Sequence, residues 1–405
     1  MVPDGWLLTN LEKLMEFKNG LNFTKKDSGE LIKIVGVGDF KDFSELVETG
    51  HLETVNVSNN IKKDELLESG DLLFVRSNGN KELIGRCLFF PKVNEKLSFS
   101  GFTIRGRVYL EKAIPEYIAY FARSSLMKQQ ISKGGGGTNI SNLSQQLLNN
   151  IVLLLPPLPE QKKIAQILST WDKAITTTEK LLANSEQQKK ALMQQLLTGK
   201  KRFLGFSREW RNGRLGELCD FKGGSAFKEV QQGKNSGDLP FIKVSDMNLK
   251  GNEIFIQNAN NWVTFEAANQ MKAKSFPKWA IVFAKVGAAL LLNRRRILQQ
   301  ETIIDNNMMA AIPKKSTDPN FLYQILQLID FAKLVQEGAV PSINQSDLSA
   351  FKIHYPDISE QQKIAIVLFT ADREIENIKQ KLHCLQQEKK ALMQQLLTGK
   401  RRVQV

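Results

Sequence analysis

The sequence of 405 residues contains 56 Lys and Arg against 42 Asp and Glu, which gives a formal net charge of +14. This excess of positive charge favours an anionic partner, and nucleic acid is the commonest one. The cysteines Cys87, Cys219 and Cys384 are too widely spaced to support a disulfide framework or a zinc site. Met1–Trp6 has no signal-peptide pattern and no apolar run is long enough to span a bilayer, so we expect a cytoplasmic protein.

The first predicted globular region runs from about Trp6 to Pro156 and has the pattern of a mixed α/β domain. Strands are predicted at Leu31–Val37, Asp71–Val75 and Phe99–Ile104, and apolar spacing predicts a helix over Glu116–Lys133. Four glycines follow this helix, without the Lys-Ser or Lys-Thr of a nucleotide-binding loop. Side chains that pair with base edges or phosphates are concentrated here, and the DNA-binding candidates are Lys25, Lys26, Arg76, Asn78, Asn80, Lys81, Arg105, Arg107, Thr138 and Asn139.

A long helix is predicted next, because apolar residues recur at alternating spacings of three and four from Ile164 to Leu196. Such a heptad repeat, sustained over about five heptads, is typical of a coiled coil. Prolines precede the helix, and Gly199 stands where a left-handed C-cap belongs. The seam residues expected to pack against a partner helix are Ile164, Leu168, Trp171, Leu192 and Leu196.

The second globular region, from about Trp210 to Pro356, repeats the mixed α/β pattern. Strands are predicted at Phe241–Val244, Ala280–Phe283 and Met309–Ile312, and a helix over Pro319–Glu337. The residues that it does not share with the first region are again rich in cationic and amide side chains. The DNA-binding candidates here are Lys285, Asn293, Arg294, Arg295, Arg296, Lys314 and Lys315.

A second long helix closes the chain, and it shows that the sequence is an internal repeat. The twelve residues KKALMQQLLTGK occur at Lys189–Lys200 and again at Lys389–Lys400. The second helix has its own seam, which includes Ile364, Leu368, Leu392 and Leu396. Two such seams can satisfy each other as an antiparallel coiled coil, which would act as a rigid spacer between the two regions. The alternative is a pair of ordinary long core helices.

Outside the seam, the repeated surface residues have a second use. Lys190, Gln194 and Gln195 recur as Lys390, Gln394 and Gln395. A surface present twice can bind two copies of one partner.

Catalytic motifs are not found in the sequence. His51, His354 and His383 lie far apart, and no pattern unites a nucleophile, a base and an orienting group. There is also no Walker A sequence and no metalloprotease motif. We therefore expect a chain that is not itself an enzyme and holds no metal.

The helix boundaries carry a family resemblance. The segments Leu155–Ala165 (LPPLPEQKKIA) and Lys190–Lys200 (KALMQQLLTGK), with their second copies, resemble the DNA specificity subunit of type I restriction-modification enzymes. The second copy departs at Tyr355–Ser359, which lacks the double proline. The resemblance implies two α/β (α+β) target recognition domains separated by two long helices, which form an antiparallel coiled coil in a pseudo-twofold repeat. The expected bounds are 1–155 for the first recognition domain and 156–202 for the central helical region. The second recognition domain is expected at 203–356 and the C-terminal helical region at 357–405.

The same resemblance implies a division of labour between chains. Each recognition domain is expected to read one half of a bipartite, asymmetric site in double-stranded DNA, while the helix pair sets the unread gap. Two methyltransferase subunits and two restriction subunits are the expected partners. No cofactor is expected on this chain, since S-adenosylmethionine, ATP and Mg belong to those partners.

Two other functions remain open on the sequence alone. A coiled-coil assembly scaffold, whose basic loops only keep it soluble, predicts no sequence preference on DNA. A stand-alone nuclease is disfavoured, because no carboxylate cluster has the spacing of a metal site.

Overall fold

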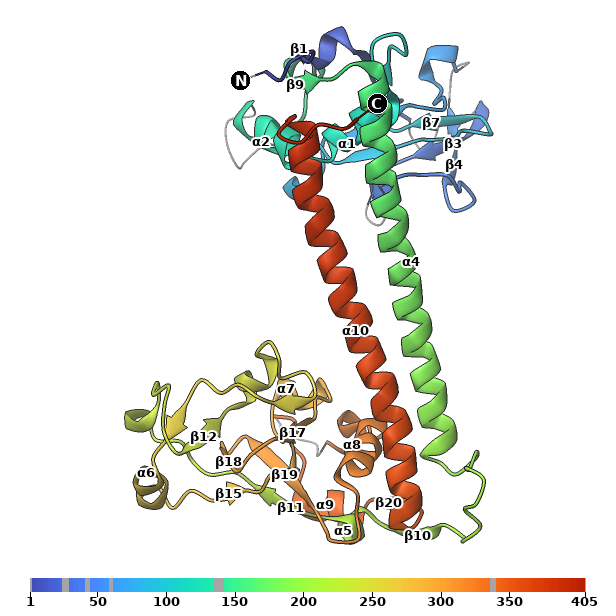
Figure 1. The fold of residues 1–405 in the computed structure, drawn as a ribbon. Helices are drawn as coiled ribbons and strands as arrows, with labels where there is room; N and C mark the ends of the chain where they lie inside the picture. The colour runs from blue at the N-terminus through green and yellow to red at the C-terminus, as the bar shows by residue number, and fades with distance from the viewer. Residues whose placement is uncertain are drawn as a thin grey trace. The chain divides into compact units, whose positions relative to one another are not determined.

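The computed structural model describes residues 2–23, 29–40, 44–57, 61–134, 142–335 and 340–404. The chain forms two compact units, Met1–Glu179 with Gln380–Val405, and Lys180–Lys379. Each long helix is shared between them: α4 (Leu158–Leu196) begins in the first unit, and α10 (Ile358–Leu397) ends there (Figure 1). The predicted domain bounds place each helix in a region of its own, and they stay a prediction.

The described residues of the first unit form three small sheets. A two-stranded antiparallel ribbon pairs β1 (Leu7–Asn10) with β9 (Val152–Leu155). The four-stranded sheet has the order β2 (Met15–Asn19), β8 (Thr103–Val108), β5 (Leu72–Val75) and β6 (Cys87–Phe89). The three-stranded sheet has the order β4 (Glu53–Val57), β3 (Glu30–Val35) and β7 (Leu97–Phe99). The predicted strand Phe99–Ile104 is wrong, because a turn in which the Thr103 amide donates to Ser100 O (2.8 Å) separates β7 from β8.

The helices of the first unit are shorter than predicted. They are α1 (Pro115–Ala122), α2 (Ser125–Gly134) and α3 (Gln145–Asn149). The predicted helix Glu116–Lys133 is interrupted at Ser124, whose hydroxyl donates to Phe121 O (2.6 Å) and accepts from the Met127 amide (3.4 Å). The core packs Tyr117 and Phe121 of α1 against Leu168 of α4 and Leu396 of α10. The last turns of α10 therefore complete the core of the first unit.

The second unit repeats this plan with different details. Its ribbon pairs β10 (Arg211–Arg214) with β20 (Lys352–Tyr355). Its larger sheet has the order β11 (Cys219–Gly223), β19 (Met308–Pro313), β16 (Ile281–Ala284), β17 (Arg296–Leu298) and β13 (Phe255–Ile256). The other has the order β14 (Trp262–Val263), β12 (Leu239–Ile242), β18 (Thr302–Ile304) and β15 (Ser275–Phe276). Its helices are α5 (Leu215–Leu218), α6 (Phe265–Gln270), α7 (Ala288–Leu291), α8 (Pro319–Leu328) and α9 (Gln345–Ala350).

Two predicted elements of this unit end earlier than expected. Strand β12 ends at Ile242, because Val244–Asn248 forms a 3-10 turn. Helix α8 ends at Leu328 instead of continuing to Glu337, since the Asp330 side chain caps a separate 3-10 turn at Phe331–Leu334 by accepting from the Ala332 amide (3.1 Å).

The heptad seam is confirmed in both helices. The seam residues predicted above are buried or half-buried in both helices, while most other residues of the helices are exposed. In the first unit Ile164 and Leu168 share one core with Leu396, and in the second unit Ile364 and Leu368 share one with Leu196. Gly199 and Gly399 have φ of 72° and 67°, the left-handed conformation predicted for the C-caps. None of the described helices is long and apolar enough to cross a membrane.

Gly20 and Gly224 occupy equivalent positions in the two units, and neither site has room for a side chain. A Cβ would lie 2.2 Å from Ser100 O at Gly20 and 2.0 Å from Asp305 O at Gly224. Both obstacles are backbone atoms, which cannot move aside cheaply. We expect Gly224→Ala to lower the free energy of unfolding by about 1–3 kcal/mol, measured by urea denaturation. Gly38→Ala is the control, because no described atom lies within 4 Å of a Cβ there, and an equal loss in both variants would contradict this explanation.

Candidate nucleic-acid interface

The Glu-Gln pair repeated at the start of each long helix makes buried contacts that hold this part of the unit together, and we call this part the base of the unit. In the first unit the buried Glu160 carboxylate accepts from Trp6 Nε1 (2.9 Å) and from Nε and Nη2 of Arg402 (2.8 and 2.9 Å). Burial raises the pKa of Glu160, but the hydrogen bonds from Arg402 and Trp6 outweigh it and hold the pKa below its usual value. Gln161 is also buried and accepts from the Ile114 amide (2.8 Å) just before α1.

The second unit contains the same arrangement. Glu360 accepts from Trp210 Nε1 (3.1 Å) and from Nε and Nη2 of Arg202 (3.0 and 2.7 Å), and Gln361 accepts from the Asp318 amide (3.0 Å). We call each Trp-Glu-Arg set a latch. Since a latch joins the beginning of one long helix to the segment following the other, the repeated Glu-Gln motif has a structural role.

Polar pairs also interrupt the apolar seam at equivalent places. In the first unit Lys389 pairs with Asp172, which also accepts from the Tyr120 hydroxyl (2.8 Å). In the second unit Lys189 Nζ lies 2.5 Å from Asp372 Oδ1, and Gln324 Nε2 donates to the same carboxylate (2.8 Å). In each unit a residue from the first half of one long helix contacts a residue from the second half of the other, so the two helices are antiparallel. Partly buried charges of this kind fix the register of a seam.

Beyond this base, residues 76–81 of the first unit form a partly exposed loop, here called the recognition loop. The Arg76 amide donates to Phe102 O (2.8 Å), and Arg76 O accepts from the Leu143 amide (2.7 Å). Asn78 Oδ1 accepts from the Asn80 amide (2.7 Å), which shapes the loop. Lys285 is the matching residue of the second unit, since its carbonyl accepts from the Ile343 amide (3.0 Å).

The structure corrects the prediction for Arg105, which is buried, while Arg107 is partly exposed and has structural partners of its own. Arg105 is 0% exposed, donates to Asp64 O (2.6 Å) and pairs with Glu16. Arg107 makes a bidentate pair with Asp71 (2.9 and 2.8 Å). Both side chains therefore hold strand β8 against its neighbours, and Arg105 is not accessible to DNA.

In the second unit only one arginine of the predicted triplet is fully exposed. Arg295 is 0% exposed, donates to Ile329 O (2.5 Å) and stacks 3.8 Å from the Phe331 ring centroid, and burial lowers its pKa to about 10. Arg296 donates to Met247 O (3.0 Å), and Asn293 to Asp330 (2.7 Å), so both have structural roles. Arg294 is exposed beside Asn248.

The remaining candidates divide into two groups. Lys81, Lys314 and Lys315 are exposed, although Lys314 donates to Gly216 O (2.6 Å) and so has a structural contact as well. Four candidates fall outside the described residues, namely Lys25, Lys26, Thr138 and Asn139.

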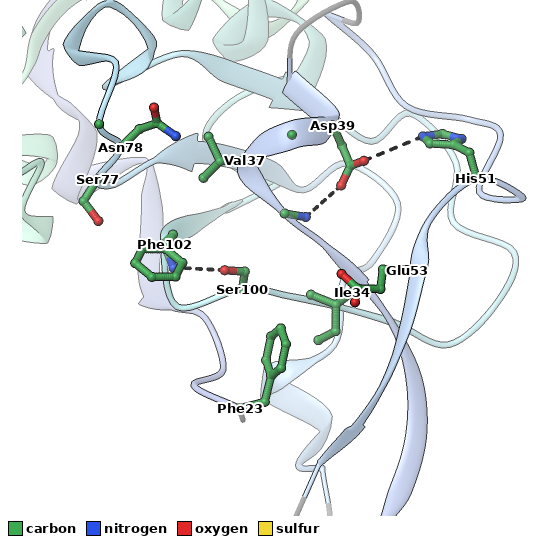
Figure 2. Close-up of a pocket in the computed structure, with 13 residues that line it drawn as sticks. Phe23, Ile34, Val37, Asp39, His51, Glu53, Ser77, Asn78, Ser100 and Phe102 are labelled. Atoms are coloured by element: carbon green, nitrogen blue, oxygen red, sulfur yellow. Dashed lines mark hydrogen bonds and ion pairs between the residues drawn. The ribbon is translucent and has the colours of Figure 1, made fainter. Parts of the chain in front are cut away.

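Two hollows that the sequence did not reveal flank the recognition loop. The aromatic pocket, about 780 Å³, is lined by Ser77 and Asn78 of the loop and by Phe23, Ile34, Val37, Asp39, His51, Glu53, Ser100 and Phe102 (Figure 2). The basic hollow, about 610 Å³, begins at Lys81 and is also lined by Arg86, Arg123 and Lys128. No periodic signal in the sequence connects these residues, since they come from several separate segments.

The arginine triplet gives a sharp test of this interface. We expect Arg294→Ala to weaken DNA binding at all sequences and to reduce the slope of log K against log salt by about 1, because one phosphate contact is lost. Arg295→Ala should instead destabilise the fold, since it empties a buried site. Binding titrations at several salt concentrations measure the first effect, and an unchanged salt slope in Arg294→Ala would reject a phosphate contact.

Comparison with known protein families also divides this chain into two repeats. The family model described as "Type I restriction modification DNA specificity domain" matches residues 3–187 and again residues 207–387. The type I restriction enzyme StySPI specificity subunit of Salmonella potsdam is 27% identical over 179 residues, 42% of this chain. That match spans only 36% of the relative's length.

Two further relatives match almost end to end. The putative type I restriction enzyme MjaX specificity subunit of Methanocaldococcus jannaschii is 27% identical over 428 residues, covering 99% of this chain and 95% of the relative. The crystal structure of a type I restriction-modification system S subunit from M. genitalium has a TM-score of 0.60 at 15% identity, covering 97% of this chain and 96% of that one, which shows the shared fold. Because the two family-model matches cover well over half of the sequence, this chain belongs to the type I restriction-modification DNA specificity family.

Proposed function

We propose that this chain directs a type I restriction-modification complex to a bipartite DNA sequence. Family membership gives the chain a role in DNA recognition, and the duplicated fold supports two half-sites. The observation that carries the proposal is the contrast between parts: the latches and seam pairs are the same in both units, whereas the recognition loop and its counterpart around Lys285 differ. A common base with different loops suits one partner type and two DNA half-sites.

The partners follow from the same duplication. Two methyltransferase subunits would dock on the repeated helix surface, which includes Lys190 and Gln194 with their copies Lys390 and Gln394. Two restriction subunits would join that assembly in the cytoplasm. S-adenosylmethionine, ATP and Mg would be bound by these partners, and this chain would carry no cofactor and perform no catalysis.

The helix pair would set the unread gap between the half-sites. Its polar pairs, Asp172 with Lys389 and Asp372 with Lys189, support this part of the proposal because they tie each helix to one register. The scaffold alternative gives no reason for two different recognition surfaces on a common base, so we do not favour it.

Native mass spectrometry of the co-expressed complex tests the partner proposal. The expected mass contains one copy of this chain and two methyltransferase subunits. Replacing Lys190 and Lys390 together by Glu should lower methyltransferase occupancy without unfolding the chain, since both residues are exposed. A single bound methyltransferase in the parent complex would reject the duplicated docking surface.

A further inference from the structure

The aromatic pocket and the basic hollow carry different chemistry, and residues of the recognition loop line both. Ser77 and Asn78 line the pocket, whereas Lys81 lines the hollow. The loop is anchored at its start, because Phe102 O accepts from the Arg76 amide (2.8 Å). A ligand that reaches both hollows must therefore present two chemically different groups to residues 76–81.

The described lining of the aromatic pocket disfavours a phosphate. Two carboxylates, Asp39 and Glu53, line it, and no Lys or Arg is among its described lining residues. In the view of Figure 2, Phe23, Phe102 and Ser100 lie on one side, with Asp39, His51 and Glu53 on the other. Phe102 is 63% exposed and available for stacking. A flat, uncharged group with hydrogen-bond donors fits this combination of aromatic rings and carboxylates.

The two carboxylates of this pocket differ in how far the fold already uses them. Asp39 Oδ2 accepts from the Gly36 amide (2.8 Å), and Asp39 Oδ1 lies 3.9 Å from Nε2 of His51. Glu53 is exposed at the start of β4. Glu53 is therefore the carboxylate better placed to accept from a bound ligand.

The basic hollow suits the opposite chemistry. Lys81, Arg86 and Lys128 are exposed and line it together with Arg123, against one carboxylate among its described lining residues, that of Glu82. Arg123 is partly engaged, because its Nη1 donates to Ser44 O (3.3 Å) and its Nη2 lies 3.7 Å from Glu45. Four cationic side chains around one hollow attract the phosphates of a nucleic-acid backbone.

From these two lining chemistries we propose that the aromatic pocket receives a nucleobase drawn out of the DNA stack, while the basic hollow holds the neighbouring phosphate. This inference rests on the proposed function and adds the mode of reading in the first unit. A base inside a duplex has no free face for an aromatic ring, so stacking on Phe102 or Phe23 requires it to leave the stack. Carboxylates accept from exocyclic amino groups, which adenine, cytosine and guanine carry and thymine lacks.

Single mismatches provide the first test. The assembled complex is titrated with duplexes carrying one mismatch in turn at each position of the half-site read by the first unit. An extruded base costs less to unpair when it is mismatched. At one position the mismatched duplex should therefore bind at least about 5-fold more tightly than the matched duplex, and we call this increase the mismatch gain. Reading in the groove predicts equal or weaker binding at every position.

Substitutions in the aromatic pocket then test whether it receives the base at that position. Phe102→Ala should abolish the mismatch gain and weaken specific binding roughly 5- to 150-fold, and the fold should tolerate it because the ring is exposed. Phe265→Ala is the matched control, since Phe265 is 58% exposed in the second unit and does not line the pocket. A mismatch gain that persists in Phe102→Ala belongs to a methyltransferase and overturns the inference.

The amino-group prediction has its own readout. At the same position, purine in place of adenine, 2-pyrimidinone in place of cytosine, or hypoxanthine in place of guanine should weaken binding by the parent chain about tenfold. Glu53→Gln should lose that discrimination. If the parent complex shows no preference for any sequence, the proposed function itself fails. If it is sequence-specific but shows no mismatch gain at any position, only the extruded base is rejected.

Discussion

Inserting one heptad into each long helix lengthens the unread gap of the DNA site by about three base pairs. The insertions follow Glu179 and Lys379, equivalent positions where the two compact units meet in sequence. Seven residues add roughly 10 Å of helix at 1.5 Å per residue, and one base pair of duplex rises about 3.4 Å. Inserting whole heptads in both helices keeps the apolar seam in phase. Sequencing of methylated DNA from cells that carry the variant complex measures the gap.

The control places the same seven residues after Gly205, in the connector between α4 and β10. No described atom lies within 4 Å of the position that a Cβ on Gly205 would take, so the connector has room for the insertion. We expect this variant to keep the parental gap. A parental gap in the double-heptad variant, with methylation retained, would show that the helices do not measure the distance.

Glu160→Ala destabilises the first unit by about 2–4 kcal/mol at neutral pH. The substitution leaves the Trp6 indole N–H and the Arg402 guanidinium without their shared carboxylate, which is buried. Hydrogen exchange measures the loss unit by unit: amides of α1 should lose protection, while those of α8 keep theirs. Glu186→Ala is the control, because its pair with Lys379 (3.0 Å) is exposed and should contribute less than about 1 kcal/mol.

The contribution of Glu160 to the free energy of unfolding depends on pH in a defined direction. Its pKa is lower in the folded chain than its usual value, so the folded state favours the ionised form. The stability contribution is therefore complete above the unfolded pKa of about 4.3 and declines as pH falls through the folded pKa. Urea denaturation of the parent and of Glu160→Ala should show a difference that is constant from about pH 7 to about pH 5 and shrinks below about pH 4. A difference that grows in acid would contradict the ionised latch.

The repeat and the helix seams were predictable because they are local patterns. A 3.5-residue spacing needs only neighbouring positions, and the left-handed glycines at Gly199 and Gly399 follow directly from the end of that pattern. The latches were not predictable in the same way. Glu160 meets Arg402 across 242 positions, and the sequence shows only a basic run that suits any helix end.

The DNA-binding candidates show the same limit. Arg76, Arg105 and Arg295 look alike in sequence, yet the first lies half-buried at the recognition loop while the other two are fully buried. One signal was available for β8: Arg105 and Arg107 are two residues apart on a strand, so they share one face. The partners that hold them, Glu16 and Asp71, lie in other strands or loops and become neighbours only through the sheet.

We propose above all that the two units of this chain choose the DNA sequence for its partners. Long-read mapping of methylated adenine, in cells that co-express the chain with its methyltransferase, tests this most directly. We expect one bipartite motif that disappears when the chain is deleted, and a change confined to one half when residues 76–81 are exchanged for 285–290. Methylation that persists without the chain, or a motif that changes in both halves after the loop exchange, would contradict the proposal.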